Sequence, residues 1–80
     1  MTVLVLLFGI SRDIVGSKSI QIDFEGEVCV KDLMDKMKKN YPKFEELSSL
    51  LVAVNDEYAS DDTVLSGNEE IALIPPVSGG

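Results

Sequence analysis

The first apolar run of the chain, TVLVLLF at residues 2–8, is rich in leucine and β-branched residues and ends before Gly9. A continuous run of this length is typical of a strand that is covered on both faces and is therefore central in its sheet. Residues 19–25, SIQIDFE, alternate apolar and polar side chains instead, which predicts a half-buried antiparallel strand. Residues 10–16, ISRDIVG, predict a short helical turn or loop that connects the two strands.

The clearest helical pattern spans residues 30–41, VKDLMDKMKKNY. One apolar stripe recurs at the i, i+3, i+4 and i+7 spacing and is formed by Val30, Leu33, Met34 and Met37. Lysines gather in the last turns, where they suit the helix dipole, and Asn40 and Pro42 mark the end of the helix. Cys29 occupies the N-cap position, where a thiol caps more weakly than Ser or Asp, so we interpret it as a small, half-buried packing residue.

Short elements separated by polar turns follow the helix. A further helical turn is expected at FEELSSL, residues 44–50, and a strand at LVAVN, residues 51–55. The chain then turns into a short strand near Tyr58. We expect Val64–Leu65 to be an apolar pair within a polar loop, and a tight turn to lead into the last strand, EEIALIP, residues 69–75.

This order of elements fits one arrangement, in which the helix covers one face of a mixed sheet. The first and last strands are separated by most of the chain, as parallel neighbours require, and are expected to pair at the centre of the sheet. The predicted fold class is therefore α+β with the ubiquitin-like β-grasp topology, one main helix and a flexible C-terminal tail. Residues 1–75 are expected to form a single domain, and residues 76–80 an extended Gly-Gly tail.

Length and charge narrow the range of functions. Eighty residues are enough for one small domain, and 45% hydrophobic with 26% charged residues argues against disorder. The net charge of −7 disfavours direct binding to nucleic acid, because little in the chain can neutralise phosphates. The acidic surface suits a basic protein partner, or it simply keeps a small protein in solution.

Several chemistries are excluded by composition. The chain has one cysteine and no histidine, so it has neither an internal disulfide nor a Ser-His or Cys-His nucleophile, and no metal site is expected. The apolar run at residues 2–8 is too short to span a bilayer, and it lacks the basic start and cleavage site of a signal peptide. We therefore expect a cytoplasmic protein.

The charged clusters of the sequence are weak candidates for catalysis. Adjacent carboxylates in exposed turns do not face a common cleft, so we interpret three pairs as solvated surface: Glu45-Glu46, Asp61-Asp62 and Glu69-Glu70. A modest basic cluster stands out in this acidic chain and consists of Lys36, Lys38, Lys39 and Lys43. It is either a solvated helix end or a docking point for an acidic partner.

The C-terminal sequence PPVSGG is the strongest functional signal. Pro75-Pro76 favour an extended path directly after the last strand, so the tail is expected to point away from the domain and to reach roughly 16 Å. Val77-Ser78 supply the side chains available for recognition. Gly79-Gly80 have no Cβ, so they can pass through a tunnel too narrow for other residues. The group presented is the Gly80 carboxylate, which after activation as an adenylate could accept a sulfur nucleophile and become a thiocarboxylate.

With these residues identified, the chain resembles the small, sulfur-carrying subunits of molybdopterin synthase over essentially all of its length. The resemblance rests on VLLF near the start, SRDIVGS in the first connection, AVN at residues 53–55, and LSGNEEIALIPPVSGG at residues 65–80. Cys29 departs from the family pattern, in which Ser or Thr is more usual before the helix, and this difference bears on the cap of the helix.

The resemblance implies a carrier and not an enzyme. A ubiquitin-activating-type enzyme would adenylate Gly80 with ATP and Mg²⁺, and a cysteine desulfurase or rhodanese-like donor would supply sulfur for the thiocarboxylate. The large subunit would hold cyclic pyranopterin monophosphate and provide the catalytic residues, and two sulfur transfers would build the dithiolene. The implied assembly is a heterotetramer, and this chain would hold no stable cofactor of its own.

The resemblance also assigns roles to single residues. It implies that Gly80 bears the sulfur and that Gly79 is its neighbour in the partner's tunnel. The other residues implied in partner binding are Val77 and Ser78 along the tunnel, Ile74, Pro75 and Pro76 at its exit, and Arg12, which matches a charged position of the family.

Other functions share this fold and tail. They include sulfur carriers for thiamine, tRNA thiolation and cysteine synthesis, and ubiquitin-like modifiers that are joined to lysines of target proteins. The double proline favours the molybdopterin role over the thiamine carriers. It separates that role less well from the protein modifiers.

Overall fold

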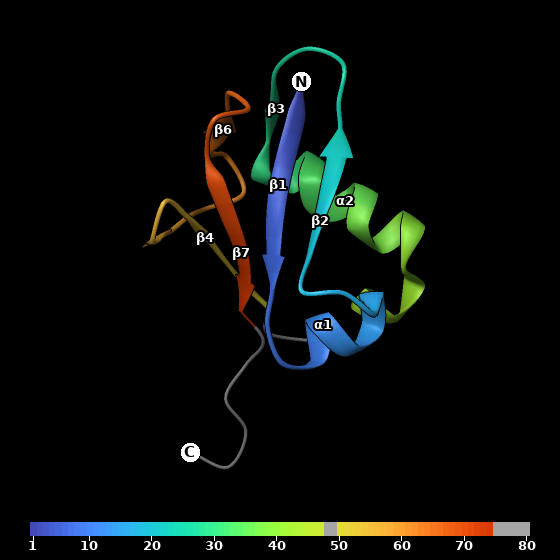
Figure 1. The fold of residues 1–80 in the computed structure, drawn as a ribbon. Helices are drawn as coiled ribbons and strands as arrows, with labels where there is room; N and C mark the ends of the chain where they lie inside the picture. Colours follow the sequence, from blue (N-terminus) through green and yellow to red (C-terminus); the bar gives the residue numbers. More distant parts are fainter. Residues whose placement is uncertain (48–49, 75–80) are drawn as a thin grey trace.

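The computed structural model describes residues 1–47 and 50–74 (Figure 1). Within these ranges, a five-stranded sheet has the order β2-β1-β7-β4-β5. Its strands are β1 (Thr2–Leu7), β2 (Ser19–Asp23), β4 (Leu51–Val54), β5 (Glu57–Tyr58) and β7 (Glu70–Ile74). β1 runs antiparallel to β2 and parallel to β7, so the predicted parallel pairing of the first and last strands at the centre of a mixed sheet is confirmed.

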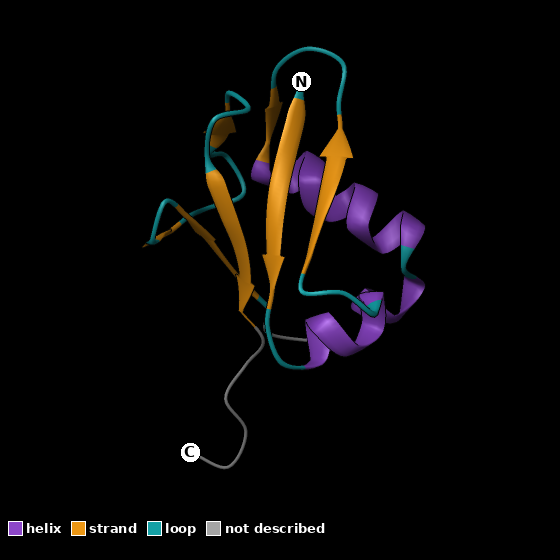
Figure 2. Cartoon of the chain, viewed as in Figure 1, coloured by secondary structure: helices purple, strands orange, loops and turns teal. Residues whose placement is uncertain are grey.

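One main helix packs on one face of this sheet, as predicted (Figure 2). The helical elements are α1 (Ile10–Val15), α2 (Val30–Asn40) and the 3₁₀ helix η1 (Pro42–Glu46). Three side chains of the predicted apolar stripe of α2 are completely buried, namely Val30, Leu33 and Met37, while Met34 is half-buried. The helical turn expected at residues 44–50 begins two residues earlier, because Pro42 is compatible with the first position of a helix.

Cys29 is the N-cap residue of α2, as the sequence predicted, and it is half-buried. The Asp32 carboxylate accepts hydrogen bonds from the backbone N–H of Cys29 at 3.0 Å and from its Sγ at 3.3 Å. These bonds favour the charged carboxylate, and the bond from the backbone N–H is the main reason that the pKa of Asp32 lies below its ordinary value. The Asp32 side chain therefore stabilises the first turn of α2, where the thiol of Cys29 alone would be a weak cap.

A second, two-stranded sheet was missed by the sequence analysis. β3 (Val28–Cys29) pairs antiparallel with β6 (Val64–Leu65), so the expectation that Val64–Leu65 lies within a loop is wrong. Strands of two residues are too short to show an alternating pattern. The pairing brings the start of α2 beside a distant turn and buries Leu65 completely.

The expectation that β1 is covered on both faces is also wrong. Val3, Val5 and Leu7 are buried against α2, but Leu4 on the other face is 37% exposed. The strand is central in the sheet, yet in the described part of the chain the helices cover only one face of it (Figure 1). The uncovered face is called the open face below. Burial in the core does not explain why β1 has apolar side chains on this face.

Candidate functional site

Most of the residues predicted for the site lie outside the described residues. These are the tail residues Pro75, Pro76, Val77, Ser78, Gly79 and Gly80, so their predicted roles and the predicted tail at residues 76–80 stay predictions. Ile74 and Arg12 are described. Ile74 ends β7, and the site can therefore be built from the surface that surrounds the end of this strand.

The register of the sheet decides which side chains surround Ile74. Leu51 lies directly opposite Ile74 in the antiparallel pairing of β4 with β7, and Ala53 lies opposite Tyr58 in the pairing of β4 with β5. Directly opposed residues share a face of a sheet. Because Leu73 next to Ile74 is buried against the core, Ile74 and its partners lie on the open face.

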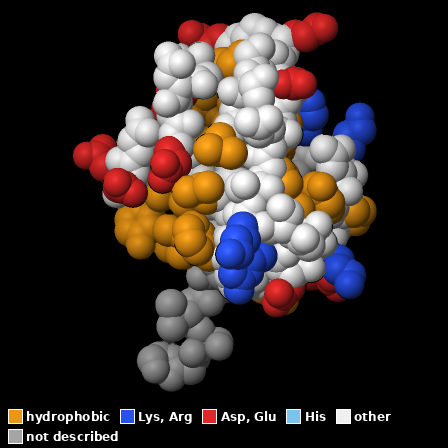
Figure 3. Space-filling view, viewed as in Figure 1, with side chains coloured by type: hydrophobic (Ala, Val, Ile, Leu, Met, Phe, Trp, Pro, Cys, Tyr) orange, Lys and Arg blue, Asp and Glu red, His pale blue; other side chains and the backbone are white. Residues whose placement is uncertain are grey.

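These side chains form an apolar patch on the open face. Two of its members are strongly exposed, Leu51 at 47% and Tyr58 at 73%. Figure 3 shows hydrophobic side chains gathered on this side, over the ends of β7 and β4. The apolar patch is defined here as Leu4, Leu6, Leu51, Tyr58, Ala72 and Ile74. A contiguous exposed apolar surface of this kind is typical of a protein-binding site.

Polar residues bound the apolar patch on the β2 side. Gln21 and Ser19 lie opposite Leu4 and Leu6 in the register of β2 with β1, so the open face changes from apolar to polar between these two strands. An apolar centre with a polar border is the usual composition of a protein interface.

Arg12 lies on α1 and is exposed. β1 leads into α1, and β1 is parallel to β7, so α1 and the end of β7 lie at the same end of the sheet (Figure 1). The fold thus places Arg12 and Ile74 at one end of the domain. Its predicted contact with a partner stays a prediction.

Glu69 differs from the solvated surface residue that was expected. It is half-buried, and its carboxylate accepts hydrogen bonds from the backbone N–H groups of Ser66 at 2.9 Å and Gly67 at 2.9 Å. The hydroxyl of Ser66 donates a further hydrogen bond at 3.0 Å. The N–H of Ser66 is the first cause of a pKa of Glu69 below its ordinary value. This carboxylate has a structural role, since it holds the turn that leads into β7.

Resident metal and membrane sites have no support in the described ranges. No group of three or more His, Cys, Asp or Glu side chains is placed there to hold a metal ion. No helix within residues 1–47 or 50–74 is long and apolar enough to cross a membrane. The predicted cytoplasmic location stays a prediction.

The apolar patch was not found from the sequence. Its members come from strands β1, β4, β5 and β7, which are widely separated along the chain, and each alone is an ordinary exposed apolar residue. The available signal was the leucine-rich first strand, which the sequence analysis assigned to a sheet covered on both faces. The apolar residues at its alternate positions instead belong to the open face.

Comparison with known proteins identifies the class of the fold and then the family. The fold is the ubiquitin-like β-grasp that the sequence predicted, as the match to a putative molybdopterin converting factor subunit 1 from Pyrococcus furiosus shows. That match has a TM-score of 0.88 and 28% identity, and it covers 96% of this chain and 99% of the other. Residues 5–80 match the model of the ThiS family, so the chain belongs to that family.

The similar proteins include some named as sulfur carriers and some named as protein modifiers. A molybdopterin synthase sulfur carrier subunit from Dictyostelium discoideum is 42% identical over 80 residues, which are 95% of this chain and 93% of the relative. The structure of SAMP1, the small archaeal modifier protein 1 of Haloferax volcanii, matches with a TM-score of 0.85 and 27% identity over 100% of both chains.

A further solved structure shows a related chain together with a partner. It is described as a protein–protein complex of subunits 1 and 2 of molybdopterin-converting factor from Helicobacter pylori 26695. The match has a TM-score of 0.70 and 27% identity and covers 100% of this chain and 100% of that chain. That relative therefore forms a complex with a second subunit.

Proposed function

We propose that this protein is the sulfur-carrier subunit of a molybdopterin synthase and that it carries sulfur as a thiocarboxylate on Gly80. The observation that carries the proposal is the ThiS-family match, which extends through residue 80 and so includes the terminal Gly-Gly. The 42% identity to a molybdopterin synthase sulfur carrier subunit selects this pathway among the sulfur carriers.

The proposed cycle begins with activation of the tail. An oxygen of the Gly80 carboxylate attacks the α-phosphate of ATP on an adenylating partner with Mg²⁺, which forms an acyl-adenylate and releases pyrophosphate. The outer sulfur of a persulfide on a donor such as a cysteine desulfurase or rhodanese then displaces AMP and forms an acyl disulfide with Gly80. A second thiol attacks the donor sulfur of that bond, so that a disulfide forms and the thiocarboxylate is released, in which one oxygen of Gly80 has been replaced by sulfur.

The second half of the cycle takes place on the large subunit. The tail enters that subunit, and the thiocarboxylate sulfur displaces an oxygen substituent from a carbon of cyclic pyranopterin monophosphate to form a thioester. Water then hydrolyses the thioester, which leaves the sulfur on the substrate and returns the Gly80 carboxylate. Two such transfers supply both sulfurs of the dithiolene. In this proposal the catalytic residues belong to the large subunit and this chain binds no cofactor of its own.

The apolar patch suits the docking step of this cycle. It surrounds the last described residue of β7, Ile74, so a partner that covers the patch also receives the chain that follows. Burial of Leu51 and Tyr58 would supply hydrophobic free energy for docking, at roughly 25 cal/mol per Å² of apolar surface removed from water. Arg12, at the same end of the domain, would contribute a charged contact at the border.

Mass spectrometry of the intact protein tests the carrier chemistry. Protein purified from its native host should include a fraction heavier by the difference between a sulfur and an oxygen atom, located on Gly80. Deletion of Gly80 should abolish molybdopterin formation while the unfolding curve stays that of the unaltered protein. Full molybdopterin synthesis by the shortened protein would contradict the proposal.

A second candidate function is that of a ubiquitin-like modifier, which the similarity to the small archaeal modifier protein 1 favours. A modifier forms an isopeptide bond between Gly80 and a lysine of a target, with loss of AMP from the same adenylate. Immunoblots of native lysate distinguish the two functions. A ladder of covalent conjugates that disappears when Gly80 is deleted would support the modifier, and its absence would support the carrier alone.

A further inference from the structure

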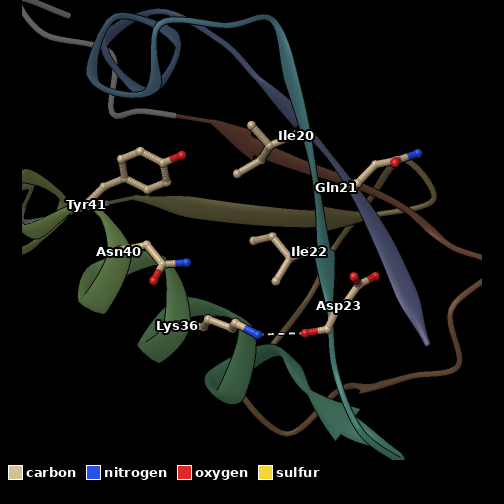
Figure 4. A pocket seen from close by; sticks show the side chains of 7 residues that line it. All are labelled: Ile20, Gln21, Ile22, Asp23, Lys36, Asn40 and Tyr41. Carbon is tan, nitrogen blue, oxygen red and sulfur yellow. Dashed lines mark hydrogen bonds between the residues drawn. The ribbon is translucent and has the colours of Figure 1, made fainter.

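A groove of about 440 Å³ lies between strand β2 and helix α2, at the edge of the sheet beyond the polar border of the apolar patch. One wall is the outer edge of the sheet and the other is the C-terminal half of the helix (Figure 4). In Figure 4, Ile20 and Ile22 point toward the helix, and Tyr41 points toward Ile20. The groove is lined by Ile20, Gln21, Ile22, Asp23, Lys36, Asn40 and Tyr41.

The backbone of β2 presents hydrogen-bonding groups to this groove. Met1 and Phe24, which lie next to the paired ends of β1 and β2, exchange two hydrogen bonds, at 2.9 and 2.8 Å. Counting back from Phe24, every second residue of β2 therefore forms its backbone hydrogen bonds with β1. The residues between them, including Gln21 and Asp23, therefore direct their N–H and C=O groups outward. Within the described chain β2 is the last strand on this side of the sheet, so its outer edge has the form of a template for a further strand.

One backbone oxygen of this edge already accepts a hydrogen bond from a side chain of the helix. Lys36 reaches across and donates a hydrogen bond from Nζ to the backbone oxygen of Asp23 at 2.6 Å, and the same Nζ lies 4.8 Å from the ring centre of Phe24. The Oγ of Ser17 donates to the oxygen of Ser19 at 2.9 Å. Gln21 lies between these two points, with its backbone groups turned toward the groove.

Lys36 is the basic residue that lines the groove, and it opens a lysine-rich stretch of the chain, although Lys38 of that stretch lines a different hollow beside Asp61. Residues 36–43 contain four of the seven Lys and Arg residues of the chain and no Asp or Glu, although the net charge is −7. Asp23 lines the groove, but its carboxylate accepts a hydrogen bond from the Thr2 hydroxyl on the open face. Figure 3 shows Lys and Arg side chains on the side of the molecule where α2 lies.

We propose that the outer edge of β2 binds an extended, acidic segment of another protein, which pairs with β2 as an additional strand. Main-chain hydrogen bonds to Gln21 would provide affinity, and alternate apolar side chains of the segment would pack against Ile20 and Tyr41. An acidic residue flanking them would meet Lys36, which lines the groove. A second copy of this chain is a poorer occupant, because pairing two β2 edges would bring two lysine-rich helix ends together.

The proposed site is independent of the sulfur-carrier function. β2 and β5 are the opposite edges of the sheet, and the apolar patch extends from β1 to β5 on the open face. A partner at the β2 groove would therefore leave the part of the apolar patch on β4 and β5 and the end of β7 accessible. The site would allow this protein to bind a second partner while its C-terminal end is engaged.

Titration of the labelled full-length protein with a synthetic peptide, acetyl-Asp-Asp-Val-Ile-Val-Ile-Asp-Asp-amide, tests this inference by NMR. The backbone amides of Ser19, Gln21 and Asp23 should show the largest shifts and should exchange more slowly with solvent. A matched peptide with Lys in place of every Asp should bind much more weakly. Equal binding of the two peptides, or shifts centred on Leu51 and Tyr58, would overturn the proposal.

Two kinds of variant sharpen the test. Gln21→Pro removes an outward N–H that β1 does not use, so it should weaken peptide binding about tenfold or more while the β1–β2 pairing persists. Should that variant not fold, Lys36→Glu, at a residue that lines the groove, should still weaken binding several-fold, whereas Lys31→Glu, in the first turn of the same helix, should have little effect. Equal effects of the two lysine changes would contradict a site at the groove. Concentration-dependent shifts of the β2 amides without peptide would assign the edge to a second copy and also overturn the proposal.

Discussion

Asn55 and Glu70 are joined by two hydrogen bonds across the start of the last strand. The N–H of Asn55 donates to the oxygen of Glu70 at 2.9 Å, and the N–H of Glu70 donates to the side-chain Oδ1 of Asn55 at 3.0 Å. Asn55 has a positive φ of 51°, in a region that asparagine tolerates better than most residues. This pair continues the register of β4 with β7, and that register places Leu51 beside Ile74 at the other end.

Replacing Asn55 tests how much this link contributes. Asn55→Ala should lower the free energy of unfolding by about 2 kcal/mol, because it removes the acceptor for Glu70 and places alanine at a positive φ. Asp56→Ala, at a φ of 69° in the same turn, is the matched control for backbone strain and should cost about 1 kcal/mol. Urea denaturation measures both values, and equal losses would show that the side-chain hydrogen bond contributes nothing.

The apolar patch should be needed for binding to a large subunit. Leu51→Asp places a charge at the centre of an interface that must lose water, so binding should weaken by at least tenfold, measured by calorimetry. Val64→Asp is the control, because Val64 is 53% exposed and Leu51 is 47% exposed, but Val64 lies in the β3–β6 sheet. Similar binding by both variants and the unaltered protein would remove the patch from the interface.

The Glu69 carboxylate should make stability dependent on pH. Its pKa is lowered in the folded state, so it contributes stability above its unfolded pKa of about 4.3, and this contribution is lost as pH falls through the lower folded value. Glu69→Gln should therefore destabilise the protein at pH 7, by about 1 kcal/mol, and the difference should shrink toward zero near pH 3. The neighbouring change Glu70→Gln should leave the thermal midpoint nearly unchanged at both pH values, and a constant difference for Glu69→Gln would contradict this role.

The buried stripe of α2 should dominate the stability of the domain. Leu33 is completely buried, so Leu33→Ala should cost about 2 to 5 kcal/mol, a large part of the stability expected for a domain of this size. Met34→Ala, at the adjacent half-buried position, should cost distinctly less. Chemical denaturation of the two variants gives the comparison, and equal losses would mean that α2 does not pack on the sheet through this stripe.

Local patterns determined the elements and much of the topology. The spacing of Val30, Leu33 and Met37 was enough to find the helix and its buried stripe, because a helix repeats its faces every 3.6 residues. The alternation of apolar and polar residues from Ile20 to Phe24 identified β2, because successive side chains of a strand point to opposite faces of the sheet. The tail sequence PPVSGG pointed to Gly80 through the chemistry of bare glycines and a terminal carboxylate.

The surfaces depended on tertiary structure. Leu4, Leu51 and Tyr58 become neighbours only when β1, β7, β4 and β5 take their order in the sheet, and nothing within one strand records that order. The groove between β2 and α2 exists for the same reason, since it needs the outer edge of β2 and the C-terminal half of α2 side by side. The sequence by itself determined which elements form, and it predicted that the chemistry lies at Gly80. The packing of those elements decided which faces a partner can reach, because only packing determines which apolar residues are covered and which stay exposed to water.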